Sequence, residues 1–109
     1  MEECICGQIA QHEIPKEFTY EDEDIMVFPD IHPSKPIHLL IIPKSHIKEL
    51  HVLDNPVLFE KLGKVIRQMI LKMELENKGY NVVINGGGAQ EVDHLHIHLM
   101  GPITKAAVV

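Results

Sequence analysis

The 109-residue sequence contains no tryptophan, and only 5% of its residues are aromatic. It has no apolar run approaching the ~20 residues that a transmembrane helix needs, so we expect no membrane partner. Basic residues are also scarce, because ten lysines and arginines face sixteen aspartates and glutamates and the formal net charge is −6. This deficit argues against a nucleic-acid partner, since affinity for a nucleic-acid backbone comes mainly from basic side chains. A small anionic ligand in a local pocket is still compatible with this composition.

Cysteine is equally rare. Cys4 and Cys6 are the only two in the sequence, and their Cys-x-Cys spacing differs from the Cys-x-x-Cys of most zinc half-sites. We interpret them as free thiols in a reducing compartment. The N-terminus, Met1-Glu2-Glu3, is acidic where a secretory signal would be basic. The sequence therefore predicts a cytoplasmic protein without an export signal.

The remaining composition is ordinary for a globular domain, with 45% hydrophobic and 24% charged residues. A chain of this length suits one domain with a modest core, so we expect residues 1–109 to form a single domain. Apolar residues at helical spacing predict a short helix over 4–12 and a long amphipathic helix from Asn55-Pro56 to Gly79. Apolar and alternating runs predict strands over 18–21, 25–28, 38–42 and 80–85.

The most informative stretch covers residues 93–101. Three histidines alternate there with large aliphatic residues, which is the period of a β-strand. On a strand, His94, His96 and His98 would line one face above a solvent-facing cleft, and the aliphatic residues would anchor the other face. Most connections between the expected strands are too short for a parallel crossover. We therefore expect an α+β fold, with a five-stranded antiparallel sheet and one long and one short helix.

A row of imidazoles permits several functions. Neighbouring same-face residues on a strand lie about 7 Å apart, so a metal site would need a further ligand such as His38 or His46. Three surface histidines without a role are improbable in such strict register. The other interpretation is an anion site, in which the triple glycine at 86–88 presents backbone N–H groups to phosphate and Asn85 and Gln90 add neutral donors. A neutral histidine facing phosphorus can then attack it.

At these residues the sequence resembles the histidine triad (HIT) superfamily, whose signature is His-φ-His-φ-His-φ-φ with φ apolar. The signature is complete here at 94–100. The resemblance covers nearly the whole chain and looks most like the Hint branch, the purine nucleoside phosphoramidate hydrolases. Further matching segments, in the family's order, are Ile14-Pro15, 21–24, 28–33, 38–47, 78–80, Asn85 and 90–92.

The resemblance implies a role for each matching residue. His96 would be the nucleophile that attacks the α-phosphorus and carries the nucleotidyl group as a phosphohistidine. His98 would hydrogen-bond the phosphate and help proton transfer to the leaving amine. His94 would orient the site, with His38 behind it as a fourth histidine. The resemblance also implies substrate contacts. Asp30 would accept hydrogen bonds from the ribose hydroxyls, and the base would lie against Phe28, Ile31, Ile5 and Ile9. The phosphate or leaving group would contact Asn85, Ala89, Gln90 and Glu91.

The function that we favour from the sequence is hydrolysis of a purine nucleoside 5′-phosphoramidate to a nucleotide and an amine, without a metal or other cofactor. The resemblance also implies a homodimer whose two sheets join into one of ten strands. Three alternatives stay open: a dinucleoside polyphosphate hydrolase of the Fhit type, a nucleotide-binding scaffold with little turnover, and a zinc-binding protein. One departure from the family pattern bears on the substrate. Glu91 stands where many members have serine beside the phosphate, and a carboxylate there repels an anion.

Overall fold

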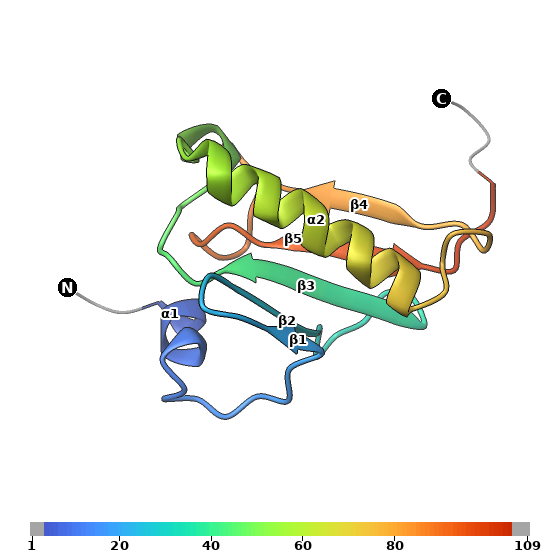
Figure 1. The fold of residues 1–109 in the computed structure, drawn as a ribbon, viewed down its shortest axis with the longest axis horizontal. Coiled ribbons are helices and arrows are strands. Elements are labelled where there is room, and N and C mark those ends of the chain that lie inside the picture. The colour runs from blue at the N-terminus through green and yellow to red at the C-terminus, as the bar shows by residue number, and fades with distance from the viewer. Residues whose placement is uncertain (1–3, 106–109) are drawn as a thin grey trace.

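The computed structural model describes residues 4–105, and it contains a single five-stranded sheet with a long helix lying across one face (Figure 1). The strand order is β1-β2-β3-β5-β4, and every neighbouring pair is antiparallel. This confirms the predicted α+β fold. In chain order the elements are α1 (Ile5–Ala10), β1 (Tyr20–Glu21), β2 (Ile25–Pro29), β3 (Ile37–Pro43), the short 3-10 helix η1 (Leu50–Val52), α2 (Pro56–Lys72), β4 (Asn81–Ile84) and β5 (Ile97–Gly101). None of the helices among these residues is long and apolar enough to cross a membrane.

The sheet separates two apolar layers, because side chains alternate between its faces. Leu39 and Ile41 of β3 face α2 and pack with Ile97 and Leu99 of β5 in the main core. The alternate residues of β3 face the opposite side, where α1 covers a smaller cluster. That cluster contains Cys6, Ile9, Met26, Phe28 and Ile42, with Leu40 packed against it. The even-numbered positions of β3 and β5, which include His38 and His98, thus lie on the side away from α2.

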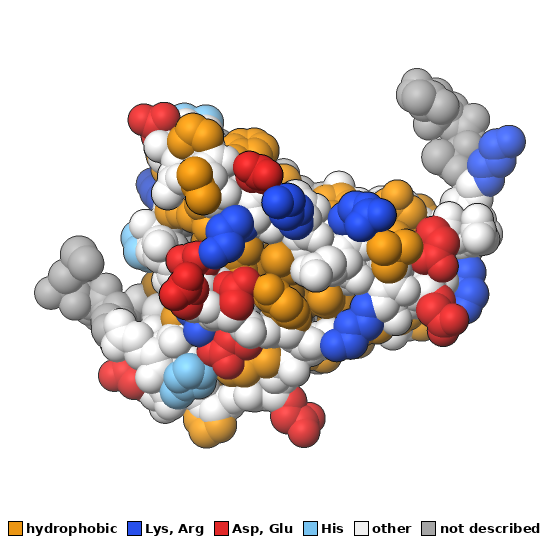
Figure 2. Space-filling view, viewed as in Figure 1, with side chains coloured by type: hydrophobic (Ala, Val, Ile, Leu, Met, Phe, Trp, Pro, Cys, Tyr) orange, Lys and Arg blue, Asp and Glu red, His pale blue; other side chains and the backbone are white. Residues whose placement is uncertain are grey.

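Helix α2 begins where the sequence predicts. The Asn55 side chain accepts the N–H of Leu58, and Pro56 occupies the first turn. Its buried stripe comprises Leu58, Leu62, Val65 and Met69, and each such side chain stabilises the fold by about 1.5–3 kcal/mol when fully buried. Figure 2 shows lysine and arginine side chains spread along the opposite, exposed side of this helix.

The end of α2 differs from the prediction. The helix ends at Lys72, and not at Gly79, because Glu74 adopts a left-handed backbone with φ of 56°. Apolar residues continue beyond this point, and the fully buried Leu75 belongs to the core without being helical. Gly79 has φ of 80° in the following turn, where a Cβ would collide with the carbonyl of Ile103.

The histidine segment also differs from the prediction. Strand β5 starts at Ile97, so only His98 lies inside it. The N–H of Leu95 donates to the carbonyl of Ile47 at 2.6 Å, and Nε2 of His94 lies 2.7 Å from the carbonyl oxygen of Pro43 at the end of β3. As a result His94 is 0% exposed. The expectation that all three histidines lie on a strand above a solvent-facing cleft is therefore wrong, because β5 begins after His94 and His96, and because His94 is buried while the other two are partly exposed.

Candidate active site

His96 lies directly before β5 and is partly exposed. Its Nδ1 is 2.8 Å from the main-chain oxygen of His94. A carbonyl oxygen can only accept, so Nδ1 carries the hydrogen and Nε2 carries the lone pair of the neutral ring. The chain's own backbone thereby selects the tautomer whose outer nitrogen can act as a nucleophile. The family resemblance implies that His94 orients the site. In the structure, its main-chain oxygen orients the ring of His96.

His98 lies beside His96, with 5.0 Å between the ring centroids. Its Nδ1 is 2.9 Å from Nε2 of His38, which is buried on β3. The register explains this pair, because Leu40 lies opposite His98 and places His38 on the diagonal. His38 is thus behind His98, and not behind His94 as predicted. Burial lowers the pKa of His98, and the neighbouring histidine rings lower it further.

Asp30 comes directly after β2 and reaches the same group. Its Oδ2 is 3.5 Å from Nε2 of His38, and its Oδ1 accepts the N–H of His32 at 2.9 Å. The sequence alone suggests only a turn residue at this position. The structure shows that β2 and β3 bring its carboxylate next to the buried histidine, and its contact with ribose hydroxyls stays a prediction.

The residues predicted to contact the base fall into two classes. Ile31 and Ile5 are exposed, at 73% and 54%. Phe28 and Ile9 are only 4% exposed and pack in the smaller apolar cluster, where Phe28 also meets the ring of Phe18 edge to face. Phe28 and Ile9 are therefore core residues, and the side chains of this set that are open to solvent are those of the two isoleucines.

The triple glycine does not form the phosphate cradle that we expected. The N–H of Gly87 donates to Oε1 of Glu49 at 2.8 Å, and the N–H of Gly88 donates to Oε1 of Gln90 at 3.0 Å. The N–H of Ala89 donates to the carbonyl of Gly86 at 3.1 Å. These three donors are therefore occupied inside the loop. Both Gly87 and Gly88 have positive φ, which is the conformation that favours glycine here.

Glu49 was missed by the sequence analysis, although it anchors this loop. It is 6% exposed. Its Oε2 accepts the side-chain amide of Gln90 at 3.2 Å, and the hydrogen bond from Gly87 lowers the pKa of its carboxyl. A single glutamate in a connecting segment carries no sequence signal for such a role. Only the fold brings residue 49 next to the glycines.

The residues predicted to contact the phosphate or leaving group differ in their exposure and in their hydrogen bonds within the protein. Both polar ends of Gln90 are engaged within the protein, since its amide also approaches Asp93 at 3.4 Å. Glu91 is exposed and close enough to His98 for its charge to favour the protonated ring. Asn85 is exposed directly after β4. Asn85, Ala89 and Glu91 are thus the exposed members of this set.

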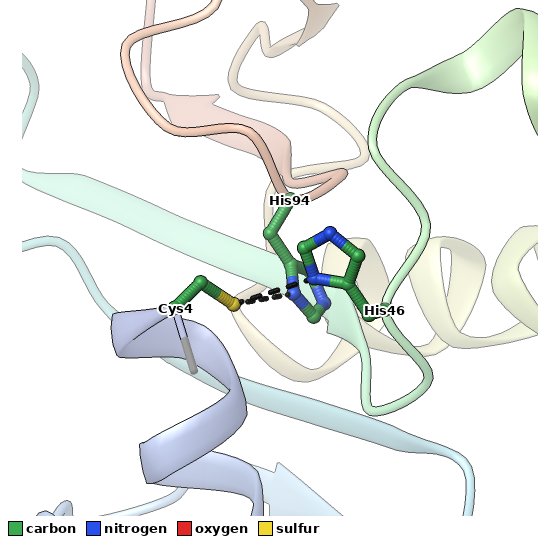
Figure 3. Close-up of side chains that lie close together, drawn as sticks. All are labelled: Cys4, His46 and His94. Atoms are coloured by element: carbon green, nitrogen blue, oxygen red, sulfur yellow. Dashed lines mark hydrogen bonds between the residues drawn. The ribbon is translucent and has the colours of Figure 1, made fainter. Parts of the chain in front are cut away.

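A second histidine group lies on the inner side of the segment (Figure 3). Sγ of Cys4 is 3.2 Å from Nδ1 of His94 and 3.5 Å from Nδ1 of His46. One donor atom from each of the three residues lies within 4.8 Å of the others. A cysteine sulfur and two imidazole nitrogens are the donors that Zn²⁺ prefers, so this set fits a metal ion.

The two thiols have different surroundings. Both are free, as predicted. Cys4 caps α1 by accepting the N–H of Gly7 and points to the imidazoles. Cys6 is buried among apolar side chains, and burial raises the pKa of its thiol to about 11. Cys4 is therefore the sulfur available as a ligand, and its partners lie 42 and 90 residues away in the chain.

Comparisons with known proteins agree with this geometry. Residues 11–104 match the family model described as HIT domain. The chain is 43% identical over 106 residues to Protein HitA of Neisseria gonorrhoeae, covering 93% of this chain and 97% of that protein. It is 38% identical over 109 residues to the 14 kDa zinc-binding protein of Zea mays, covering 89% and 80%. It superposes with a TM-score of 0.87 on the crystal structure of a HIT family hydrolase from Legionella pneumophila Philadelphia 1, at 37% identity and covering 96% and 97%.

Proposed function

Because the chain belongs to the HIT family, we propose that it is a hydrolase of the Hint type. Its substrate is a purine nucleoside 5′-phosphoramidate, and its products are the nucleoside monophosphate and an amine. No cofactor takes part in this reaction. The observation that carries the proposal is the hydrogen bond between Nδ1 of His96 and the carbonyl of His94, since it leaves the Nε2 lone pair free for covalent catalysis.

The reaction has two steps. In the first, Nε2 of His96 forms a bond to phosphorus, the P–N bond breaks, and the amine leaves with both bonding electrons and gains a proton. In the second, water attacks phosphorus, the N–P bond to His96 breaks, and the water loses a proton. Hydrogen bonds to the phosphoryl oxygens stabilise the charge in both transition states. His98, whose ring lies 5.0 Å from that of His96, is placed to supply one of them.

The substrate contacts follow from the arrangement of the site. The carboxylate of Asp30 lies next to the imidazole pair and accepts hydrogen bonds from the ribose hydroxyls. Ile31 and Ile5 cover the base, above the floor that Phe28 and Ile9 provide. Asn85 and Glu91 face the leaving group, and the loop at 86–90 that Glu49 anchors holds them there.

Turnover measurements separate this function from the alternatives. We expect a higher kcat/KM for an adenosine 5′-phosphoramidate than for diadenosine polyphosphates, because the negative charge of Glu91 disfavours a polyphosphate leaving group. The opposite ranking would favour the Fhit-type hydrolase. Binding of AMP without turnover of either substrate would favour a nucleotide-binding scaffold.

We also propose a homodimer that joins two sheets into one of ten strands. Strand β4 is an edge strand, and Val82 on it is 39% exposed, which is the kind of edge that a second chain can cover. Light scattering of the purified protein tests this proposal. A mass of twice 12.4 kDa is expected, and a monomer at micromolar concentration contradicts it.

A second candidate function is zinc binding by Cys4, His46 and His94, and the two short sulfur–nitrogen contacts favour it. Bound zinc would be structural, because these residues tie the start of α1 to the segment that holds His96. We expect about one zinc per chain after purification in metal-containing buffer. Cys4→Ser should lose it, whereas Cys6→Ala should retain it because Cys6 points into the apolar cluster. Equal zinc contents in the two variants contradict this assignment.

A further inference from the structure

The main chain at Ser34, in the loop before β3, contacts the buried histidine of the site. The N–H of Ser34 is 3.1 Å from Nδ1 of His38. A backbone N–H can only donate, so this nitrogen must carry a lone pair and no hydrogen. The Ser34 hydroxyl donates to Sδ of Met100 at 3.2 Å, and its oxygen is farther from the imidazole, at 3.4 Å. The peptide group is therefore the principal donor to His38.

The other nitrogen of His38 faces a second imidazole and a carboxylate. Its Nε2 is 2.9 Å from Nδ1 of His98 and 3.5 Å from Oδ2 of Asp30. An ionised carboxylate can only accept, so Asp30 favours a hydrogen on Nε2. The donor on one side and the acceptor on the other thus select the same tautomer of His38, with its hydrogen on Nε2.

This tautomer determines the state of the next ring. If Nε2 of His38 donates, Nδ1 of His98 must accept, and the hydrogen of a neutral His98 is on its own Nε2. We propose that the main-chain N–H of Ser34 sets the tautomers of the His38–His98 pair, so that His98 presents a neutral Nε2–H donor to the substrate. This inference rests on the proposed function, and it makes Ser34 a positioning residue.

A protonated His98 does not fit this arrangement. Its Nδ1–H would point at the Nε2–H of His38, and relieving that clash by moving the His38 hydrogen to Nδ1 would set it against the N–H of Ser34. Burial and the neighbouring His96 and His38 rings favour neutral His98, whereas Asp30 and Glu91 oppose them. His98 therefore hydrogen-bonds a phosphoryl oxygen and keeps its proton. The proton that the leaving amine gains comes from water, and the second step returns it to water.

Two variants of Ser34 separate the peptide donor from the side chain. Ser34→Pro removes the N–H, whereas Ser34→Ala removes the hydroxyl and keeps the N–H. Long-range proton–nitrogen NMR correlations of the imidazoles report directly which ring nitrogens carry hydrogen. At pH 7.5 we expect unprotonated Nδ1 and protonated Nε2 for both His38 and His98 in the wild type and in Ser34→Ala. In Ser34→Pro we expect mixed tautomers, and kcat about tenfold below that of Ser34→Ala, the scale of one lost hydrogen bond.

The wild-type spectrum gives the first test of the proposal, and the spectrum of Ser34→Pro gives the second. A hydrogen on Nδ1 of His38, or doubly protonated His98 at pH 7.5, would overturn it, and so would a Ser34→Pro variant with unchanged tautomers. The signals of His46 and His94 act as an internal control, because they lie outside the pair and change only if Ser34→Pro disturbs the fold. The spectra need no substrate, so a protein with these tautomers and no turnover would contradict the proposed function and leave this inference intact.

Discussion

Two histidine groups lie side by side in this protein, and they are built for different tasks. The inner group consists of His94, His46 and Cys4, and the ring of His94 is fully buried. The outer group, His96 and His98 with His38 behind them, keeps two rings partly open to solvent. The two groups meet at one hydrogen bond, from the ring of His96 to the main chain of His94. A single alternating motif thus provides both a buried supporting histidine and the histidine that we propose as the nucleophile.

The largest difference between the groups should appear in catalysis. His96→Ala removes the nucleophile, and we expect kcat/KM for an adenosine phosphoramidate to fall by at least about 10⁴-fold, as when other catalytic nucleophiles are deleted. AMP binding and the circular dichroism spectrum should persist. His12→Ala is the matched control, because this exposed histidine contacts Glu21 and Phe18 and belongs to neither histidine group. A His96→Ala enzyme within tenfold of the wild type would contradict the assignment.

The groups should rank in the reverse order for stability. His94→Ala leaves a cavity and removes hydrogen bonds to the carbonyl of Pro43 and to Cys4, so we expect a loss of about 2–4 kcal/mol in the free energy of unfolding. Replacing the partly exposed His96 by alanine should lower the free energy of unfolding by less than about 1.5 kcal/mol. Urea unfolding in the presence of a chelator measures both. Equal losses would mean that the inner ring is not a structural element.

These two expectations show how far the sequence could lead. The alternation at 94–100 points to His96 as the proposed nucleophile, because the family signature depends on local spacing. It could not divide the histidines, since the division depends on Leu95 pairing with Ile47 and on Cys4 reaching across the fold. The fold was more accessible. The start of α2 is encoded locally by Asn55-Pro56, whereas its end at Lys72 was hidden by apolar residues that continue into the core.

A smaller effect should appear in the loop next to the outer group. Glu49→Ala removes the acceptor of the Gly87 N–H and of the Gln90 amide. We expect KM for the phosphoramidate to rise about tenfold while kcat changes less, because a hydrogen-bonded support is lost and the nucleophile is not touched. Glu60→Ala removes an exposed carboxylate that pairs with Lys64 on α2 and serves as the control. A fall in kcat with unchanged KM would contradict a role in holding the loop.

The smallest expected effect is a pH dependence of stability. Burial lowers the pKa of His94 and of His98 below the ordinary 6.5. Between their folded pKa values and 6.5 the unfolded chain binds more protons, so stability is complete above 6.5 and is lost as the pH falls below it. Unfolding free energies of the wild type, measured with a chelator from pH 8 to pH 5, should show this decline. His94→Ala should make this decline in the unfolding free energy shallower. An unchanged slope in this variant would contradict the assignment of the decline to His94.

The central claim is that Nε2 of His96 carries the nucleotide during turnover. The most direct measurement mixes the protein with an excess of labelled adenosine phosphoramidate, quenches within milliseconds in alkaline denaturant, which preserves phosphohistidine, and maps the label by mass spectrometry. We predict a nucleotidyl group on the peptide that contains residues 94–100, with the bond at His96. Label on another histidine, or full turnover with no label on the protein at any time, would contradict the account.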